Sequence, residues 1–146
     1  MAKTYDPRMH SAEHILNQTM VRMFNTGRSF RAHIEKKKSK CDYRFNRNLT
    51  EEEINAIEKK VNEIIEKNLP VTEEFHPLEE AKKLVDTSKL PENAGEKIRI
   101  IKIGDYDACP CIGQHVTETK EIGVFKIVST DYKDGVLRIR FKLVST

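Results

Sequence analysis

Two short pairs of metal-binding residue types could do chemistry in this sequence. His10 and His14 are four residues apart in a segment with helical periodicity, so both imidazoles would lie on one face of a helix, one turn apart. Cys111 and His115 are also four residues apart, in a segment rich in turn-forming residues. Imidazoles together with a thiolate suit a borderline-soft ion such as zinc. The two pairs together predict a zinc site, although each pair alone is a weak signal.

The remaining cysteines leave one alternative open. Cys109 lies two residues before Cys111, so Cys109-Pro110-Cys111 is a thiol pair and Cys109 is a rival ligand. An odd total of three cysteines, with Cys41, does not form a secreted disulfide framework. In a reducing compartment, clustered cysteine and histidine more often indicate metal binding or catalysis.

The composition predicts one soluble globular domain over residues 1–146. Apolar residues make up 38% and charged residues 34%, and no apolar run approaches the roughly 20 residues that span a bilayer. The N-terminus lacks the apolar stretch of a signal peptide, so we expect a cytoplasmic location and no membrane contact. The net charge of +3 permits a nucleic-acid partner without indicating one.

Two helices are expected to position these residues. The first runs from Pro7, after the capping Asp6, to about Asn25, and Gly27 ends it. His10 and His14 fall at one edge of its apolar arc. The second helix starts at Thr50, where Glu53 completes a capping box, and ends before Pro70.

Strands and connections account for the rest of the chain. Asp134-Gly135 is the turn signal of a hairpin between the last two strands. The segment from Gly104 to Gln114 is expected to be a loop. The predicted strands cover 28–35, 40–45, 71–75, 98–103, 122–130 and 136–144, with a short helix at 78–85 and a polar connection at 87–97.

Both metal-binding segments resemble those of a known family. The run His10-Ser-Ala-Glu-His-Ile-Leu16 is similar to the His-x-x-x-His helix of the editing domain shared by alanyl- and threonyl-tRNA synthetases. The run from Cys111 to Ile127 resembles the second motif of that family, a Cys-x-Gly-x-His followed by Glu-Ile-Gly-x-Phe-Lys-Ile. Glu121-Ile122-Gly123 favours the alanyl type and its free-standing relatives, the AlaX proteins. The alanyl loop usually reads Cys-Gly-Gly-Thr-His, so this chain departs from it at Ile112 and Gln114.

The resemblance implies a fold, a cofactor and a reaction. The fold would be α+β, with a two-layer α-β-β-α-β-β core. His10, His14, Cys111 and His115 would hold one zinc ion. The chain would act in trans, without an aminoacylation domain or a nucleotide cofactor, and would hydrolyse the ester of misacylated tRNA. Ser-tRNA(Ala) and Gly-tRNA(Ala) are the first expected substrates. The amino-acid pocket of an aminoacylation site, when sized for alanine, cannot reject glycine and rejects a serine hydroxyl only weakly.

Three other functions remain open from the sequence. They are a Ser-tRNA(Thr) deacylase, a metallohydrolase of small esters or amides, and a non-enzymatic zinc-stabilised RNA-binding module. Four protein ligands with no open position would favour the last. The oligomeric state cannot be read from the sequence.

Further site residues are predicted around the two motifs. Glu13, Gln18, Gln114 and Thr117 are candidate catalytic or polar contacts, and Gly113 would let the backbone approach a ligand closely. Basic side chains would contact the phosphates of tRNA and make binding depend on salt. This predicted basic strip comprises Arg28, Arg31, Lys36, Lys37, Lys38 and Lys40, and Arg138, Arg140 and Lys142 form a second candidate strip on the last strand.

Overall fold

The structure is a computed structural model, and it describes residues 6–85 and 97–144. The expected polar connection at 87–97 therefore lies outside the described residues, except for Lys97. Within the described ranges no helix combines the length and hydropathy that crossing a membrane requires. The elements are α1 (Pro7–Phe24), β1 (Arg31–His33), β2 (Ser39–Arg44), α2 (Glu51–Glu66), β3 (Val71–Pro77), α3 (Leu78–Leu84), β4 (Lys97–Ile103), β5 (Asp107–Pro110), the 3-10 turn η1 (Thr119–Ile122), β6 (Val124–Lys133) and β7 (Val136–Val144).

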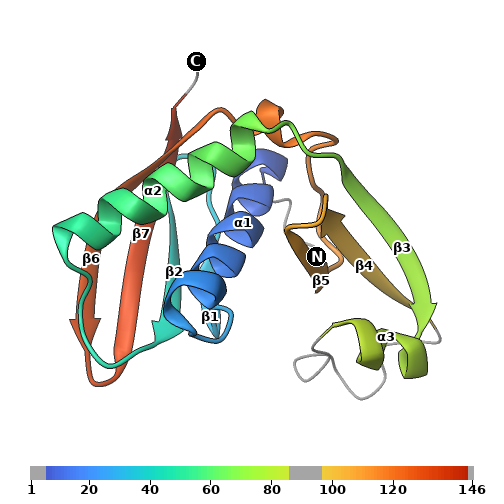
Figure 1. The fold of residues 1–146 in the computed structure, drawn as a ribbon, viewed down its shortest axis with the longest axis horizontal. Coiled ribbons are helices and arrows are strands. Elements are labelled where there is room, and N and C mark those ends of the chain that lie inside the picture. Colours follow the sequence, from blue (N-terminus) through green and yellow to red (C-terminus); the bar gives the residue numbers. More distant parts are fainter. Residues whose placement is uncertain (1–5, 86–96, 145–146) are drawn as a thin grey trace.

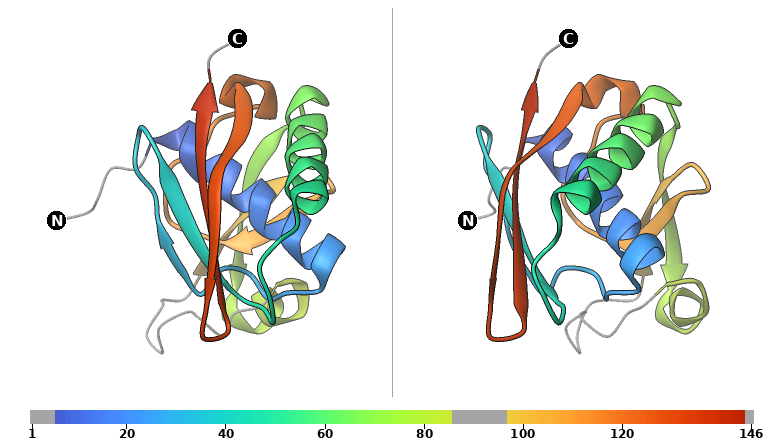
Figure 2. Two further views of the ribbon diagram at one scale, coloured as in Figure 1. Left: turned by 90° about the vertical axis from the view of Figure 1, so that its left-hand side faces the viewer. Right: turned by 60° about the vertical axis from the view of Figure 1, so that its left-hand side comes forward.

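The described strands form two antiparallel sheets. One has four strands in the order β1-β2-β7-β6, and the other has three in the order β3-β4-β5. Helices α1 and α2 cover one face of the four-stranded sheet, and α1 passes between the two sheets (Figures 1 and 2). Because α1 is packed on both sides, its side chains can meet residues from both sheets.

Alternation along β7 explains how the four-stranded sheet is oriented. Leu137, Ile139 and Phe141 are fully buried against the helices, while the residues between them face outward. On α2 the apolar residues recur at helical spacing and meet this face. The fully or almost fully buried residues of α2 are Ile57, Val61, Ile64 and Ile65.

The helix boundaries confirm both predicted N-caps and correct the residue that caps the end of the first helix. Thr50 and Glu53 form the expected capping box at the start of α2. At the other helix, Asp6 accepts the backbone N–H of Arg8 at 2.9 Å, as predicted for an N-cap. Helix α1 ends at Phe24, in agreement with the predicted end at about Asn25, but its C-cap is Asn25, in a left-handed conformation with φ of 56°, and not the predicted Gly27. Asparagine tolerates this conformation, so no glycine is needed there.

The predicted fold is correct in class and incomplete in layers. Around the four-stranded sheet the order α-β-β-α-β-β is present, but the three-stranded sheet adds a layer on the other side of α1. Strand β5 lies inside the segment predicted to be a loop. Its sequence Asp-Ala-Cys-Pro has no strand periodicity, and it is extended because it pairs with β4, Cys109 opposite Ile101. Tertiary pairing therefore overrode a local signal for turns.

Two strands also differ from their predicted bounds by three residues at one end. Strand β1 covers three residues of the predicted eight, because only Arg31–His33 pair with β2. Strand β6 starts at Val124, after the 3-10 turn, and continues to Lys133. The hairpin that follows turns through Asp134 and Gly135, both with positive φ, as predicted.

Candidate metal centre and cavity

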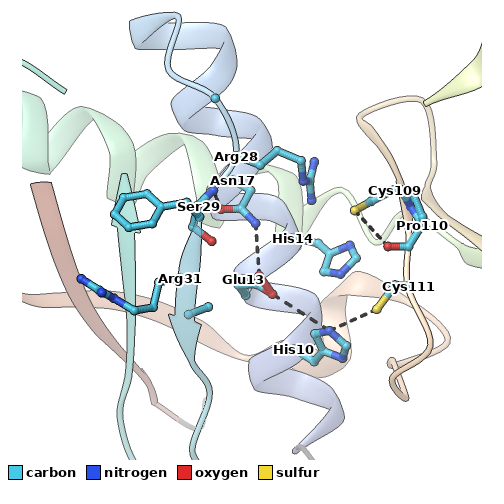
Figure 3. A pocket seen from close by; sticks show the side chains of 13 residues that line it. His10, Glu13, His14, Asn17, Arg28, Ser29, Arg31, Cys109, Pro110 and Cys111 are labelled. Carbon is cyan, nitrogen blue, oxygen red and sulfur yellow. Dashed lines mark hydrogen bonds and ion pairs between the residues drawn. The ribbon is translucent and has the colours of Figure 1, made fainter. Parts of the chain in front are cut away.

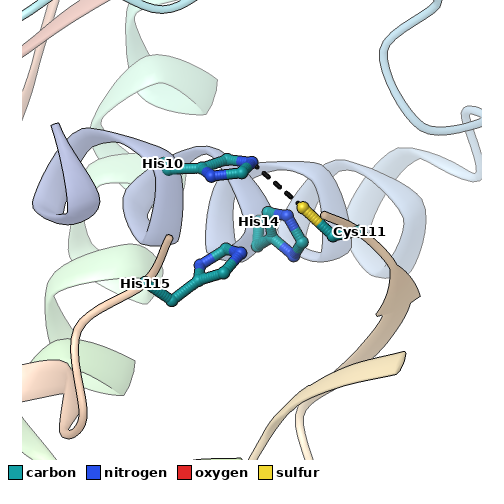
Figure 4. A group of neighbouring side chains, drawn as sticks. All are labelled: His10, His14, Cys111 and His115. Atoms are coloured by element: carbon teal, nitrogen blue, oxygen red, sulfur yellow. Dashed lines mark hydrogen bonds between the residues drawn. The ribbon is translucent and has the colours of Figure 1, made fainter. Parts of the chain in front are cut away.

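The four predicted metal ligands lie together in the structure. One donor atom from each of His10, His14, Cys111 and His115 lies within 4.8 Å of the others. The Cys111 Sγ atom is 3.3 Å from Nε2 of His10, and the rings of His10 and His115 are stacked with centroids 4.2 Å apart (Figure 4). The first two ligands come from α1, and the other two come from the loop between β5 and η1, about 100 residues later. Among the described residues, this is the cluster that could hold a metal ion.

Close backbone approach brings the loop onto the helix. Nη1 of Arg99, on β4, donates to the carbonyl oxygens of Cys111 and Gly113 at 3.1 and 2.8 Å. A Cβ atom at position 113 would lie 2.2 Å from Cε1 of His10, far inside van der Waals contact. Glycine is therefore required at position 113 for the loop to pass over the His10 ring.

The hydrogen bonds of the rings fit a bound ion. Nδ1 of His10 contacts the backbone oxygen of Gln114 at 3.2 Å, which leaves Nε2 facing Cys111. Nδ1 of His115 contacts Oγ of Ser11 at 2.9 Å. In contrast, Nε2 of His115 is buried without a hydrogen bond in the described structure. A buried polar atom without a partner is costly, and metal coordination would satisfy this nitrogen. The donor set of three imidazoles and one thiolate fits zinc.

A buried carboxylate supports the cluster from behind. Asp107, at the start of β5, is enclosed and lies 3.5 Å from Nδ1 of His14. It also accepts from Arg28 at 2.6 and 3.2 Å and from Gln18 at 2.9 Å. Burial opposes ionisation of Asp107, but the contacts with His14 and Arg28 outweigh it and hold its pKa well below the ordinary value. Asp107 therefore stays charged and orients His14.

The ionisable groups of the cluster are strongly shifted. Burial lowers the pKa of His14, but Asp107, Cys111 and Glu13 together raise it to about 9. Burial raises the pKa of Cys111, but its contacts with His10, His115 and His14 lower it to about 3. Burial raises the pKa of the neighbouring Cys109 thiol to about 12. Without an ion, the cluster thus contains a thiolate at Cys111 beside a protonated His14, whereas Cys109 is a neutral thiol.

An open cavity of about 470 Å³ lies beside the cluster. His10, His14 and Cys111 form part of its wall, so three of the four candidate ligands face a space that a small ligand could enter. Figure 3 shows the side chains that line it. The other lining residues are Glu13, Asn17, Gly27, Arg28, Ser29, Phe30, Arg31, Ala32, Cys109 and Pro110.

The four predicted catalytic or polar contacts have different surroundings. Glu13 lines the cavity next to the metal ligands. Gln18 donates to Asp107, behind His14, and is not part of the cavity wall. Gln114 is exposed and meets His10 through its backbone oxygen. The Thr117 hydroxyl donates to Glu121 at 2.6 Å on the exposed side of the loop. The structure thus brings Glu13 into the cavity and not Thr117, and the roles of all four stay predictions.

The predicted basic strip divides into three groups. Arg28 is inside the cavity and pairs with Asp107, and Arg31 lies at the rim with its guanidinium 2.8 Å from Asp42. Lys36, Lys37 and Lys38 are exposed in the connection between β1 and β2. Lys40 is half-buried on β2. Arg28 is thus an internal charge of the site and does not extend an outer surface.

Residues that the sequence analysis did not single out also build this site. Asp107 orients His14, Ser11 contacts His115, and Asn17 bonds Glu13. No spacing rule connects Asp107 to α1, because the two are joined only by the fold. Ser11 and Asn17 do have a sequence signal, because both lie on the helix within three residues of a predicted ligand.

Comparison with known proteins identifies the second motif. Residues 98–140 match the family model described as the threonyl and alanyl tRNA synthetase second additional domain. This match covers β4, β5, η1, β6 and much of β7, and it includes Cys111 and His115.

Most of the chain is also similar to alanine–tRNA ligases. It is 37% identical to that of Coxiella burnetii (strain Dugway 5J108-111) over 123 residues, which is 84% of this chain and 14% of the relative. It is 36% identical to that of Fervidobacterium nodosum over 134 residues, 90% of this chain and 16% of the relative. The enzyme of Bacillus subtilis (strain 168) is 34% identical over 121 residues, 82% of this chain and 14% of the relative. The chain thus spans about one seventh of the length of these relatives.

The cluster predicts the metal content of the purified protein. We expect close to one zinc per chain. Replacing either His14 or Cys111 by Ala should remove most of the zinc, because each substitution removes a side chain that would bind the ion directly. The measurement is elemental analysis after dialysis against a weak chelator. Cys109→Ser is the matched control and should keep its zinc. Full zinc in the His14→Ala/Cys111→Ala double variant would show that the ligands are different residues.

The shifted thiols predict a difference in reactivity. In the zinc-free protein, iodoacetamide should alkylate Cys111 before Cys109, and at a rate nearly constant between about pH 5 and 8, because the pKa of Cys111 lies below that range and that of Cys109 above it. Peptide mass spectrometry locates the modification, and zinc should protect Cys111. Preferential labelling of Cys109, or a rate at Cys111 that rises tenfold per pH unit, would contradict this assignment.

Proposed function

Since this chain carries the threonyl and alanyl tRNA synthetase second additional domain and is a homologue of alanine–tRNA ligases, we propose that it hydrolyses the ester of misacylated tRNA at a zinc site. The observation that carries this proposal is the position of the cluster. Three of the four candidate ligands line a cavity of about 470 Å³, so a bound ion would face a space open to substrate. Four protein ligands by themselves also fit a closed structural site, so it is the open cavity beside the ligands, where a further ligand could join the ion, that favours a catalytic role.

The chain's own residues suit the hydrolysis of an activated ester. His10, His14, Cys111 and His115 would hold the ion, and zinc bound there would supply a Lewis acid that polarises a carbonyl or lowers the pKa of water. Asp107 orients His14, and Arg99 fixes the loop that carries Cys111. Glu13 is the acidic residue of the cavity wall. These residues position the reacting ester and do not require a nucleotide cofactor.

The proposed substrates are Ser-tRNA(Ala) and Gly-tRNA(Ala). Their support is the similarity to alanine–tRNA ligases together with the errors that an alanine-sized pocket makes. The cavity wall offers polar groups at Asn17 and Ser29 for a small polar side chain. Ser-tRNA(Thr) is the alternative substrate within the family. The cytoplasmic location also stays a prediction.

The outer face of the four-stranded sheet supports tRNA as the partner. Lys40 and Arg140 lie opposite each other in the register of β2 and β7 and border one depression with Lys38. Arg31 lines both the catalytic cavity and a second depression on this face, beside Arg138. The arginines of this face already pair with carboxylates, Arg31 and Arg138 with Asp42 and Arg140 with Asp131. Lys38 and Lys40, next to Arg140, would supply the phosphate contacts.

The reaction predicts a preference between charged tRNAs. The zinc-loaded protein should hydrolyse Ser-tRNA(Ala) at least about 100-fold faster than Ala-tRNA(Ala), because a site that hydrogen-bonds a hydroxyl leaves polar groups unpaired with alanine. The measurement is the deacylation rate with Ser-, Gly- and Ala-tRNA(Ala). A preference for Gly-tRNA(Ala) would mean that the site selects its substrate by the size of the amino-acid side chain and not by a hydroxyl group. If the zinc-loaded protein hydrolyses none of these misacylated tRNAs, the result contradicts the enzyme proposal and favours a zinc-stabilised binding module.

If the exposed lysines contact tRNA, their removal should weaken tRNA binding without slowing hydrolysis of the ester. Lys36→Glu/Lys37→Glu/Lys38→Glu should weaken tRNA binding about tenfold or more at low salt and flatten its salt dependence, because phosphate contacts release counterions. Hydrolysis of a minimal seryl-adenosine ester should be almost unchanged, because that substrate lacks the tRNA phosphates. The measurements are tRNA affinity at several salt concentrations and the two hydrolysis rates.

The matched control for this experiment removes the same number of lysines elsewhere. Lys82, Lys83 and Lys97 are exposed on α3 and at the start of β4. Their triple replacement by Glu should leave the salt dependence of tRNA binding near that of the native chain. Equal losses in both triple variants, or an equal loss on seryl-adenosine, would mean that the three lysines do not form a specific contact.

A further inference from the structure

Glu13 has an unusual position between two metal ligands. It lies on α1 between His10 and His14, and its side chain lines the cavity with only 12% exposure (Figure 3). Its Oε1 atom is 4.0 Å from Nε2 of His10, so the carboxylate lies at the edge of the metal cluster. A ligand that touches Glu13 would thus have its neighbouring atoms within reach of the cluster.

Two buried residues fix the direction of this carboxylate. Nδ2 of Asn17 donates to Oε2 of Glu13 at 3.1 Å. Oδ1 of Asn17 accepts from the Tyr43 hydroxyl at 2.7 Å and from the backbone N–H of Ser29 at 3.2 Å. With its oxygen occupied by two donors, the Asn17 amide must present its NH₂ group to Glu13. The carboxylate is therefore held in place before any ligand arrives.

The charges of the cavity leave Glu13 as an acceptor for a cation. Arg28 forms two hydrogen bonds to Asp107, and Arg31 pairs with Asp42. Each arginine of the wall thus pairs with a carboxylate outside the wall, and Arg31 shares Asp42 with Arg138. Of the residues described as lining the cavity, Glu13 is the only carboxylate, and its hydrogen-bond partner Asn17 is neutral. A poorly solvated charge of this kind favours a positively charged donor beside it.

We propose that Glu13 binds the α-ammonium group of the aminoacyl ester and makes the site selective for esters with a free amino group. This inference rests on the proposed function and names the part of the substrate that Glu13 recognises. In every aminoacyl-tRNA the ammonium group is on the carbon next to the ester carbonyl. Binding of the ammonium group at Glu13 therefore places the carbonyl next to the metal cluster, whichever small side chain the amino acid carries.

N-acylated esters lack what Glu13 recognises. A formyl, acetyl or peptidyl group turns the ammonium into a neutral amide with one N–H, and it adds bulk where the carboxylate is packed. The site would thus reject N-formylated and peptidyl-tRNA while accepting elongator aminoacyl-tRNA. This rejection would protect the nascent chain from hydrolysis without any contact to the tRNA body.

The test compares two substrates on the same tRNA, seryl-tRNA and N-acetylseryl-tRNA. The zinc-loaded native protein should hydrolyse the acetylated ester about 10- to 100-fold more slowly in kcat/KM, the range of one charge-assisted hydrogen bond. Glu13→Gln keeps the size of the side chain and an acceptor for Asn17 but removes the charge. It should lower the rate on seryl-tRNA to near that of the acetylated ester and leave the rate on the acetylated ester almost unchanged.

A binding measurement gives a second readout that does not depend on turnover. The probes are 3′-serylamido-3′-deoxyadenosine, whose amide replaces the ester, and its N-acetyl derivative. The native protein should bind the free amine more tightly by calorimetry, and Glu13→Gln should abolish the difference. Elemental analysis verifies that the variant keeps its zinc. Glu63→Gln, on the exposed side of α2, is the matched control and should retain the native preference on both readouts.

The outcomes separate this inference from the proposed function. Native protein that hydrolyses seryl-tRNA and its acetylated form equally well overturns the inference and leaves the deacylase proposal intact. An equal loss on both substrates in Glu13→Gln also overturns it, since a general base would act on both. Native protein without activity on any aminoacyl-tRNA contradicts the deacylase proposal itself, before any variant is measured.

Discussion

The buried ion pair between Asp107 and Arg28 is the contact on which the site depends. Burying a carboxylate is costly unless it is paired and its lone pairs are used. Asp107 meets this requirement with three partners, Arg28, Gln18 and His14, which come from α1 and the segment after it. Because Asp107 starts β5, satisfying its charge brings the three-stranded sheet against the helix. The loop that follows β5 is then placed where Cys111 and His115 reach the histidines of α1.

The parts of the site that the sequence predicts are those that depend on residues close together in the chain. Spacing of four residues on a helix reveals His10 and His14, and the Cys111–His115 pair follows from residue types alone. The caps at Asp6 and Thr50 and the hairpin at Asp134 depend on neighbouring residues only, so they were also predictable. These features share one property, which is that their cause lies within a few positions along the chain.

The features that sequence reasoning did not predict have distant causes. Strand β5 exists because β4 offers it a partner, and its own residues suggest a turn. The direction of Glu13 depends on Tyr43, which is 30 positions away in the sequence and belongs to β2. Arg28 was predicted to be a phosphate contact because it is basic, but a carboxylate 79 positions later holds it inside the cavity. The sequence shows that Arg28 is basic, but only the fold shows that its partner is Asp107.

Because Gly113 passes close over the His10 ring, the positions of the loop from Cys111 to His115 differ in the side chains they can accept. A side chain at 113 would collide with a ligand, whereas Ile112 is 98% exposed and the side chain of Gln114 is also exposed. The two positions where this loop differs from the alanyl pattern Cys-Gly-Gly-Thr-His are therefore the two whose side chains point outward. Neither side chain lines the cavity. A library that varies 112 and 114 together, with 113 held as glycine, would change the contacts that this loop makes outside the cavity and leave the spacing of its ligands intact.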